Sequence, residues 1–168
     1  ASTLKDIKTN FEERGIPVKP VFLMRDPIER LISSQRMKLR KQGLRDAATE
    51  VATLRKRVAK GRGLRSNYGQ TLEALDQAFG LEHCFVGLFE TLFTKPTYSE
   101  LCHFLGIPYR EPSWGEKVNV SATKTVIPDD LLAEMGRQHA EDLKQAQQAL
   151  PNLDFQRLWP TTSRWAQA

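Results

Sequence analysis

The residues with the clearest chemical potential follow an apolar run, Val21 to Met24. Arg25 ends that run, and Asp26-Pro27 is a typical helix start, with an N-cap residue and a proline in the first turn. An arginine where a strand gives way to a helix can offer its guanidinium fork to a phosphate, and Ser33, two turns into that helix, can add a hydroxyl. Arg36, three residues after Ser33, would point a second cation to the same side. Together these residues predict an anion-binding site.

The same residue types also allow a structural interpretation. Arg25 can pair with Asp26 or Glu29 at the helix start, while Ser33 faces water. A single arginine at a strand end does not by itself distinguish the two interpretations.

The apolar pattern predicts the elements that position these residues. Two continuous apolar runs, 19–24 and 83–89, have the length of strands, and their lack of alternation predicts strands covered on both faces, as in a parallel sheet. Helical periodicity and capping residues predict helices between these strands and after them, and therefore an α/β protein. The predicted helices run from Ser2 or Thr3 to Gly15, 27–42, 47–60 (a solvated helix), from Ser66 to Gly80, 96–105 and 128–150, with an irregular loop at 112–125 and a tail at 160–168.

Length and composition set the class of protein. The chain has 168 residues, 40% hydrophobic and 27% charged, which predicts one globular domain, 1–168. No window approaches 18 consecutive apolar residues, so the sequence predicts no transmembrane segment. The first residues lack a basic start and an apolar core, so no signal peptide is expected, and a cytoplasmic location is the resulting expectation. Two cysteines form neither a disulfide framework nor a metal site.

The net charge of +5 is concentrated in one segment, 36–65. This basic segment holds eleven basic and two acidic side chains, a net charge of +9, which leaves −4 for the rest of the chain. Three interpretations stay open: a surface for an anionic acceptor such as a polysaccharide, a non-enzymatic module that binds nucleic acid or another polyanion, and a solvated helix with no partner. Nucleic acid is the least favoured partner, because the segment contains no aromatic residue and matches no nucleic-acid-binding motif.

The stretch Arg25-Asp26-Pro27-Ile28-Glu29-Arg30-Leu31-Ile32-Ser33-Ser34 resembles the 3′-phosphate-binding motif of sulfotransferases that use 3′-phosphoadenosine 5′-phosphosulfate (PAPS). The downstream sequence is similar to bacterial and carbohydrate-type members of that family. The supporting segments are Ser66 to Leu72, Phe89-Glu90-Thr91-Leu92, Thr97 to Pro108, and Val118-Asn119-Val120-Ser121 with Lys124. The resemblance covers about 19–159.

This resemblance implies a P-loop-NTPase-like sulfotransferase fold, with a parallel sheet flanked by helices. It implies PAPS as the sulfuryl donor, no metal, and a small-molecule or carbohydrate acceptor with a hydroxyl or an amine. Arg25 and Ser33 would bind the 3′-phosphate, Lys124 would approach a phosphate, and Tyr68 or Ser66 would line the nucleotide pocket. Core packing is the alternative for Tyr68.

The sequence departs from the family pattern before Arg25. Only 24 residues precede Arg25, and they contain no glycine-rich turn after a strand that could hold the 5′-phosphosulfate. No residue is at a convincing position for the catalytic base. The expectation is therefore a partial domain that corresponds to the C-terminal two thirds of a sulfotransferase and holds its 3′-phosphate-binding half.

Other chemically capable residues have structural interpretations. The three histidines, His83, His103 and His139, have no metal-ligand spacing and are expected in structural or surface positions. Trp114, Trp159 and Trp165 could stack on a sugar or a base, although core packing is the expectation for Trp159.

Overall fold

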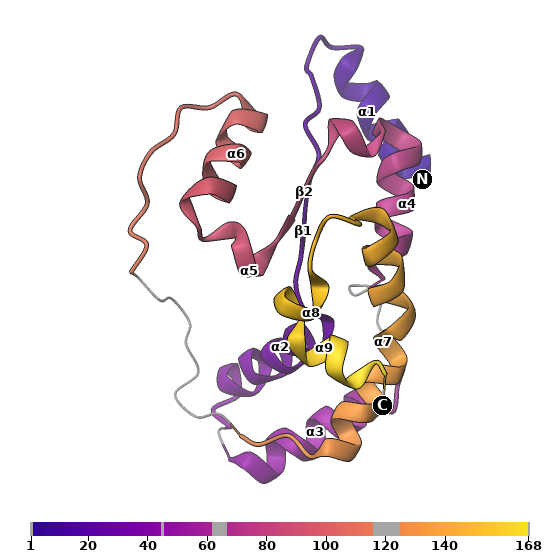
Figure 1. Ribbon diagram of the computed structural model, residues 1–168, viewed down its shortest axis with the longest axis vertical. Coiled ribbons are helices and arrows are strands. Elements are labelled where there is room, and N and C mark those ends of the chain that lie inside the picture. The colour runs from indigo at the N-terminus through magenta and orange to yellow at the C-terminus, as the bar shows by residue number, and fades with distance from the viewer. Residues whose placement is uncertain (1, 45, 62–66, 116–124, 168) are drawn as a thin grey trace. The chain divides into compact units, whose positions relative to one another are not determined.

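The computed structural model describes residues 2–44, 46–61, 67–115 and 125–167. The described residues form a mixed α/β protein that is mostly helical, with a small two-stranded parallel sheet (Figure 1). The elements are α1 (Ser2–Glu12), β1 (Val21–Met24), α2 (Pro27–Lys41), α3 (Ala47–Val58), α4 (Tyr68–Phe79), η2 (Leu81–His83), β2 (Phe85–Leu88), α5 (Phe89–Leu92), α6 (Lys95–Leu105), α7 (Asp129–Ala149), α8 (Phe155–Leu158) and α9 (Pro160–Trp165).

The chain divides into two compact units. The first unit comprises Ala1–Met24 and Tyr68–Glu116, and the second comprises Arg25–Asn67 and Lys117–Ala168. The first unit contains both strands, and the second contains α2, α3 and α7 to α9.

The sheet of the first unit pairs β1 with β2 in parallel, with Val21 opposite Phe85 and Met24 opposite Leu88. One face of this sheet packs on α4, where Phe22 contacts a cluster of buried side chains. The cluster consists of Leu75, Ala78 and Phe79. These three residues therefore belong to the buried face of α4.

The other face of β1 corrects a prediction. Val21 and Leu23 are 41% and 42% exposed, although the apolar run predicted a strand covered on both faces. On that face, Phe104 of α6 packs against Phe85 of β2, at 5.9 Å between ring centroids. An apolar run shows that a strand can be buried on both faces. It does not show how many helices pack against those faces.

Two lysines near the N-terminus hold the carboxyl ends of helices in the first unit. Lys8 Nζ donates a hydrogen bond to the Ala78 carbonyl of α4 at 3.3 Å, and Lys19 Nζ donates to the Phe104 carbonyl of α6 at 2.7 Å. The last carbonyls of a helix lack partners within it, so an ammonium group satisfies them and opposes the negative end of the helix dipole.

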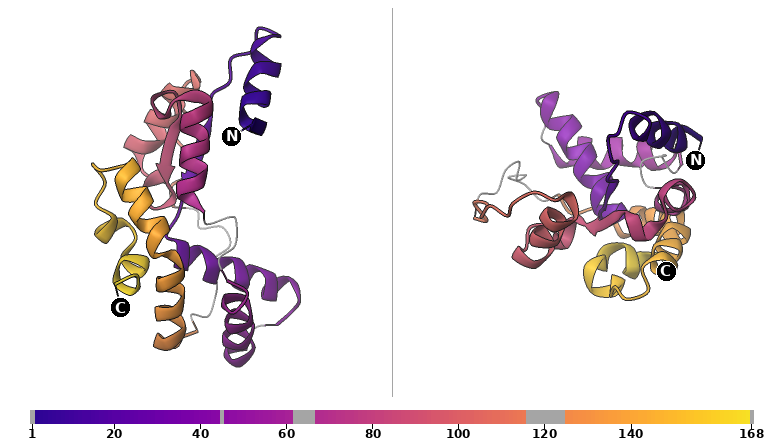
Figure 2. Two further views of the ribbon diagram at one scale, coloured as in Figure 1. Left: turned by 90° about the vertical axis from the view of Figure 1, so that its right-hand side faces the viewer. Right: turned by 90° about the horizontal axis from the view of Figure 1, so that it is seen from above.

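The core of the second unit brings together α2, α3 and α7, and Figure 2 shows α8 and α9 beside α7. Its buried side chains are Ile28, Ile32, Leu54, Val58, Ile127, Leu131 and Met135. Leu54 and Val58 are 0% and 2% exposed, so α3 is not the solvated helix that its composition predicted. Only one side of α3 is apolar, and the basic residues between Leu54 and Val58 obscure that pattern in the sequence.

The segment expected as a tail, 160–168, forms a packed helix over Pro160–Trp165. Its Thr162 is fully buried, and Trp159 just before it is also fully buried, as expected. Gly136 allows the close approach of α7 and α9, because a Cβ at this position would lie 2.0 Å from the Trp165 carbonyl oxygen. The pair of α7 and α9 therefore needs glycine at residue 136.

The ends of three other helices lie close to the predicted ones. Helix α2 begins at Pro27 and ends at Lys41, α6 ends before Gly106 with its left-handed backbone, and α7 covers nearly the whole predicted range. None of the described helices is long and apolar enough to cross a membrane.

Candidate functional site

Arg25 and Asp26 connect β1 to α2, as the sequence predicted. Arg25 is half-buried, and Asp26 is the N-cap of α2. The Asp26 carboxylate accepts hydrogen bonds from the backbone N–H groups of Ile28, at 3.0 Å, and Glu29, at 3.2 Å. Because these bonds hold the first turn of α2, the residue before them has a defined position.

Asp26 has a second role that no local pattern could reveal. Its side chain also accepts hydrogen bonds from the Thr162 N–H, at 3.0 Å, and from the Thr162 hydroxyl, at 2.6 Å. The neighbouring Thr161 hydroxyl donates to Glu29 at 2.9 Å. The start of α2 is therefore fixed to α9, 136 residues later in the chain.

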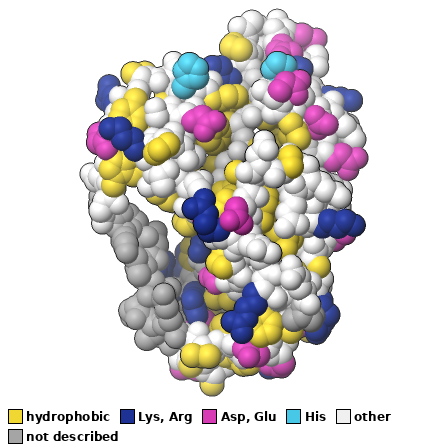
Figure 3. All heavy atoms as spheres, in the orientation of Figure 1, with side chains coloured by type: hydrophobic (Ala, Val, Ile, Leu, Met, Phe, Trp, Pro, Cys, Tyr) yellow, Lys and Arg dark blue, Asp and Glu magenta, His cyan; other side chains and the backbone are white. Residues whose placement is uncertain are grey.

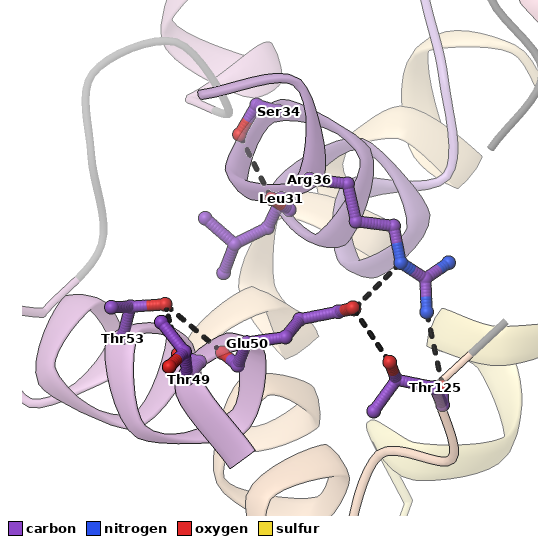
Figure 4. Close-up of polar contacts among 7 residues, drawn as sticks. All are labelled: Leu31, Ser34, Arg36, Thr49, Glu50, Thr53 and Thr125. Carbon is purple, nitrogen blue, oxygen red and sulfur yellow. Dashed lines mark hydrogen bonds and ion pairs between the residues drawn. The ribbon is translucent and has the colours of Figure 1, made fainter. Parts of the chain in front are cut away.

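Ser33 lies in the second turn of α2 and is half-buried. Its neighbour Ser34 donates to the Leu31 carbonyl of its own helix at 2.8 Å (Figure 4). The Ser33 hydroxyl, by contrast, has no hydrogen-bond partner among the described residues. It remains available to a ligand.

Arg36, the cation predicted to act beside Ser33, is instead engaged in contacts within the protein. Its Nε lies 2.6 Å from Glu50 Oε1, and its Nη2 donates to the Thr125 carbonyl at 3.0 Å. The other Glu50 oxygen accepts from the Thr125 hydroxyl at 2.7 Å (Figure 4). These partners lie 14 and 89 residues from Arg36, so no local sequence pattern indicates them.

We expect Glu50→Ala to lower the free energy of unfolding by about 2 kcal/mol, because it leaves a half-buried guanidinium without its carboxylate. Urea unfolding followed by tryptophan fluorescence measures the loss. The control is Asp130→Ala, which removes an exposed ion pair with Arg55, whose hydrogen bond lowers the pKa of Asp130. That change should cost much less than Glu50→Ala, because an exposed ion pair contributes little to stability. Equal losses in the two variants would contradict the structural role given to Glu50.

Tyr68 and Lys124 complete the predicted site residues. Tyr68 is the first residue of α4 in the first unit, is 3% exposed, and meets the ring of Phe22 edge-on at 6.0 Å. This packing supports the core alternative for Tyr68. Lys124, together with Ser66 and the segment 118–121, lies outside the described residues.

The basic segment 36–65 presents fewer available cations than its sequence suggests. Arg36 pairs with Glu50, Arg55 with Asp130, and Arg57 donates to the Gly61 carbonyl at 3.2 Å. Among its described residues, the exposed lysines are Lys38, Lys41, Lys56 and Lys60. On the face drawn in Figure 3, basic side chains are interspersed with acidic ones.

A groove of about 540 Å³ lies within the second unit, between α2, residues 125–129 and α9. Glu29 and Arg36 line it from α2, and Arg164 and Trp165 line it from α9. Ser33 is not among the residues that line this groove.

The three histidines belong to different elements, η2, α6 and α7. His83 and His103 are exposed, and His139 is 2% exposed and hydrogen-bonded to Asp142 in α7. Within the described ranges, no group of three His, Cys, Asp or Glu side chains could hold a metal ion.

Comparisons of this chain with protein-family models, with curated proteins and with solved structures find no match.

Proposed function

We propose that this chain is the 3′-phosphate-binding part of a PAPS-dependent sulfotransferase, with the P-loop-like fold of that family, and that Arg25 and Ser33 hold the 3′-phosphate. The observation that carries the proposal is the connection between β1 and α2. Arg25 precedes a fixed helix start, and two turns later the same helix offers a hydroxyl with no partner among the described residues. A guanidinium and a hydroxyl are suitable donors for phosphate oxygens.

The reaction is in-line sulfuryl transfer. The acceptor oxygen or nitrogen forms a bond to sulfur while the bond from sulfur to the 5′-phosphate oxygen breaks, and the acceptor proton passes to a base. Arg25 and Ser33 contact the 3′-phosphate, which is not a reacting group. They therefore contribute to donor binding and would affect KM more than kcat.

The test compares two nucleotides that differ only in the 3′-phosphate. We expect 3′-phosphoadenosine 5′-phosphate (PAP) to raise the midpoint of thermal unfolding more than adenosine 5′-monophosphate (AMP) does. Arg25→Ala should weaken PAP binding about tenfold to a hundredfold, since a charged hydrogen-bonding partner is lost, and leave AMP binding nearly unchanged. Ser33→Ala should weaken PAP binding by a smaller factor.

Lys38→Ala is the matched control, because it removes an exposed cation from the same helix. It should not change the preference for PAP over AMP. If the wild-type chain binds both nucleotides equally, or if Lys38→Ala loses as much as Arg25→Ala, the proposal is wrong.

A further inference from the structure

Three aromatic side chains gather in the first unit, on α6 and the segment after it. The Tyr98 ring lies 5.7 Å from the Tyr109 ring, with an angle of 65° between the planes, and 5.7 Å from the Trp114 ring, with an angle of 87°. Trp114 is 37% exposed, so its indole reaches the surface. The three rings therefore meet at steep angles and form an aromatic cluster that solvent can reach.

Glu111 holds two of these rings in place. Its carboxylate accepts one hydrogen bond from the Tyr109 hydroxyl and another from the Trp114 indole N–H. These bonds lower the pKa of Glu111, so the group is charged at neutral pH. The same carboxylate raises the pKa of Tyr109 to about 12, so the phenol is neutral there. A fixed negative charge thus lies beside neutral rings.

The ammonium group of Lys95 lies beside the Tyr109 ring and the Glu111 carboxylate. Lys95 Nζ lies over the Tyr109 ring, 5.8 Å from its centroid, and 3.8 Å from a Glu111 oxygen. The two side chains are 71% and 54% exposed, so their ion pair is weak and can be displaced. The position of Lys95 marks a point at which a ring face and a carboxylate together favour a cation.

We propose that Tyr98, Tyr109, Trp114 and Glu111 form a binding site for a small quaternary ammonium compound. Such a cation has no N–H group and holds water weakly, so it loses little when aromatic rings replace its hydration, whereas a lysine ammonium is strongly hydrated. All four residues belong to the first unit, whereas Arg25 and Ser33, the residues of the proposed 3′-phosphate site, belong to the second.

Choline and its uncharged carbon isostere, 3,3-dimethyl-1-butanol, test the proposal on the full chain. We expect saturable binding of choline in ligand-detected NMR and in tryptophan fluorescence, and no saturable binding of the isostere. Absence of saturable choline binding overturns the proposal. Equal binding of the two compounds also overturns it, because it would show apolar packing without a role for the charge.

Variants then locate the site. Trp114→Ala should weaken choline binding about tenfold, and Glu111→Gln should weaken it by a smaller factor. Lys95→Met, which removes the internal competitor, should strengthen binding by up to about fivefold. Phe93→Ala is the control, since Phe93 is 63% exposed and packs against Phe89, outside the cluster.

The changed side chains are at least partly exposed, so circular dichroism should show the wild-type fold in each variant. Unchanged choline binding in Trp114→Ala contradicts the site, as does weaker binding in Lys95→Met or in Phe93→Ala.

Discussion

Replacing Asp26 with alanine is expected to lower the free energy of unfolding by about 4 kcal/mol, the sum of two losses. The first is the N-cap of α2, which normally contributes about 1 kcal/mol. The second is the pair of hydrogen bonds from Thr162, whose N–H and hydroxyl would be left buried without an acceptor. Each buried donor without a partner costs about 1–3 kcal/mol.

Urea unfolding followed by tryptophan fluorescence measures this loss, because Trp159 and Trp165 lie in the same unit as Asp26. Asp46→Ala is the matched control. Asp46 caps α3 through the Thr49 N–H at 2.7 Å, a bond that lowers the pKa of Asp46, but this carboxylate is exposed. Its removal should cost much less than the removal of Asp26, because only an exposed helix cap is lost. Equal losses in both variants would mean that the Thr162 bonds contribute nothing.

Arg25 and Asp26, neighbours in the Arg-Asp-Pro stretch, have different roles. The Asp26 carboxylate accepts hydrogen bonds from backbone groups and from Thr162, so the role of Asp26 is structural. Arg25 and Ser33 are left as the ligand-binding residues of the proposal. Asp26→Asn keeps an acceptor for the helix cap. We therefore expect it to lower the free energy of unfolding without removing the preference for PAP over AMP.

Local signals explain why much of the fold could be predicted from the sequence. A helix start depends on a cap and a proline within three residues, as at Asp26-Pro27, and a helix end depends on a glycine such as Gly106. The two strands follow from short apolar runs bounded by proline and charge. Each of these signals lies within a few residues of the element that it specifies.

The errors arose where distant residues decide the outcome. Arg36 forms an ion pair with Glu50 and contacts Thr125. The exposed face of β1 reflects how little of the chain covers it.

The aromatic cluster was predictable in part. Trp114 is a stacking candidate by its residue type, and Tyr109 and Glu111 lie only five and three residues before it. The spacing brings them close, but only the fold adds Tyr98 and Lys95.

His139→Ala is expected to lower the free energy of unfolding by about 3 kcal/mol. The His139 ring is 2% exposed, and its Nδ1 lies 3.0 Å from Asp142 Oδ2, one turn later in α7. Alanine would leave a cavity where the ring packs, and it would remove a hydrogen bond from a carboxyl group that is fully buried. Both costs arise in the interior, where water cannot replace the lost contacts.

Two variants decide whether this cost comes from the buried pair. His139→Gln fills part of the cavity and keeps groups that can donate or accept a hydrogen bond, so it should lose less than alanine does. His83→Ala removes a histidine that lies 3.6 Å from Glu82 with both side chains 73% exposed, and its effect should stay within about 0.5 kcal/mol. If His139→Ala unfolds at the same urea concentration as His83→Ala, the buried pair contributes nothing to stability. A large loss at residue 139 alone would instead show that His139 has a structural role in the core, one of the two kinds of position that the sequence left open for it.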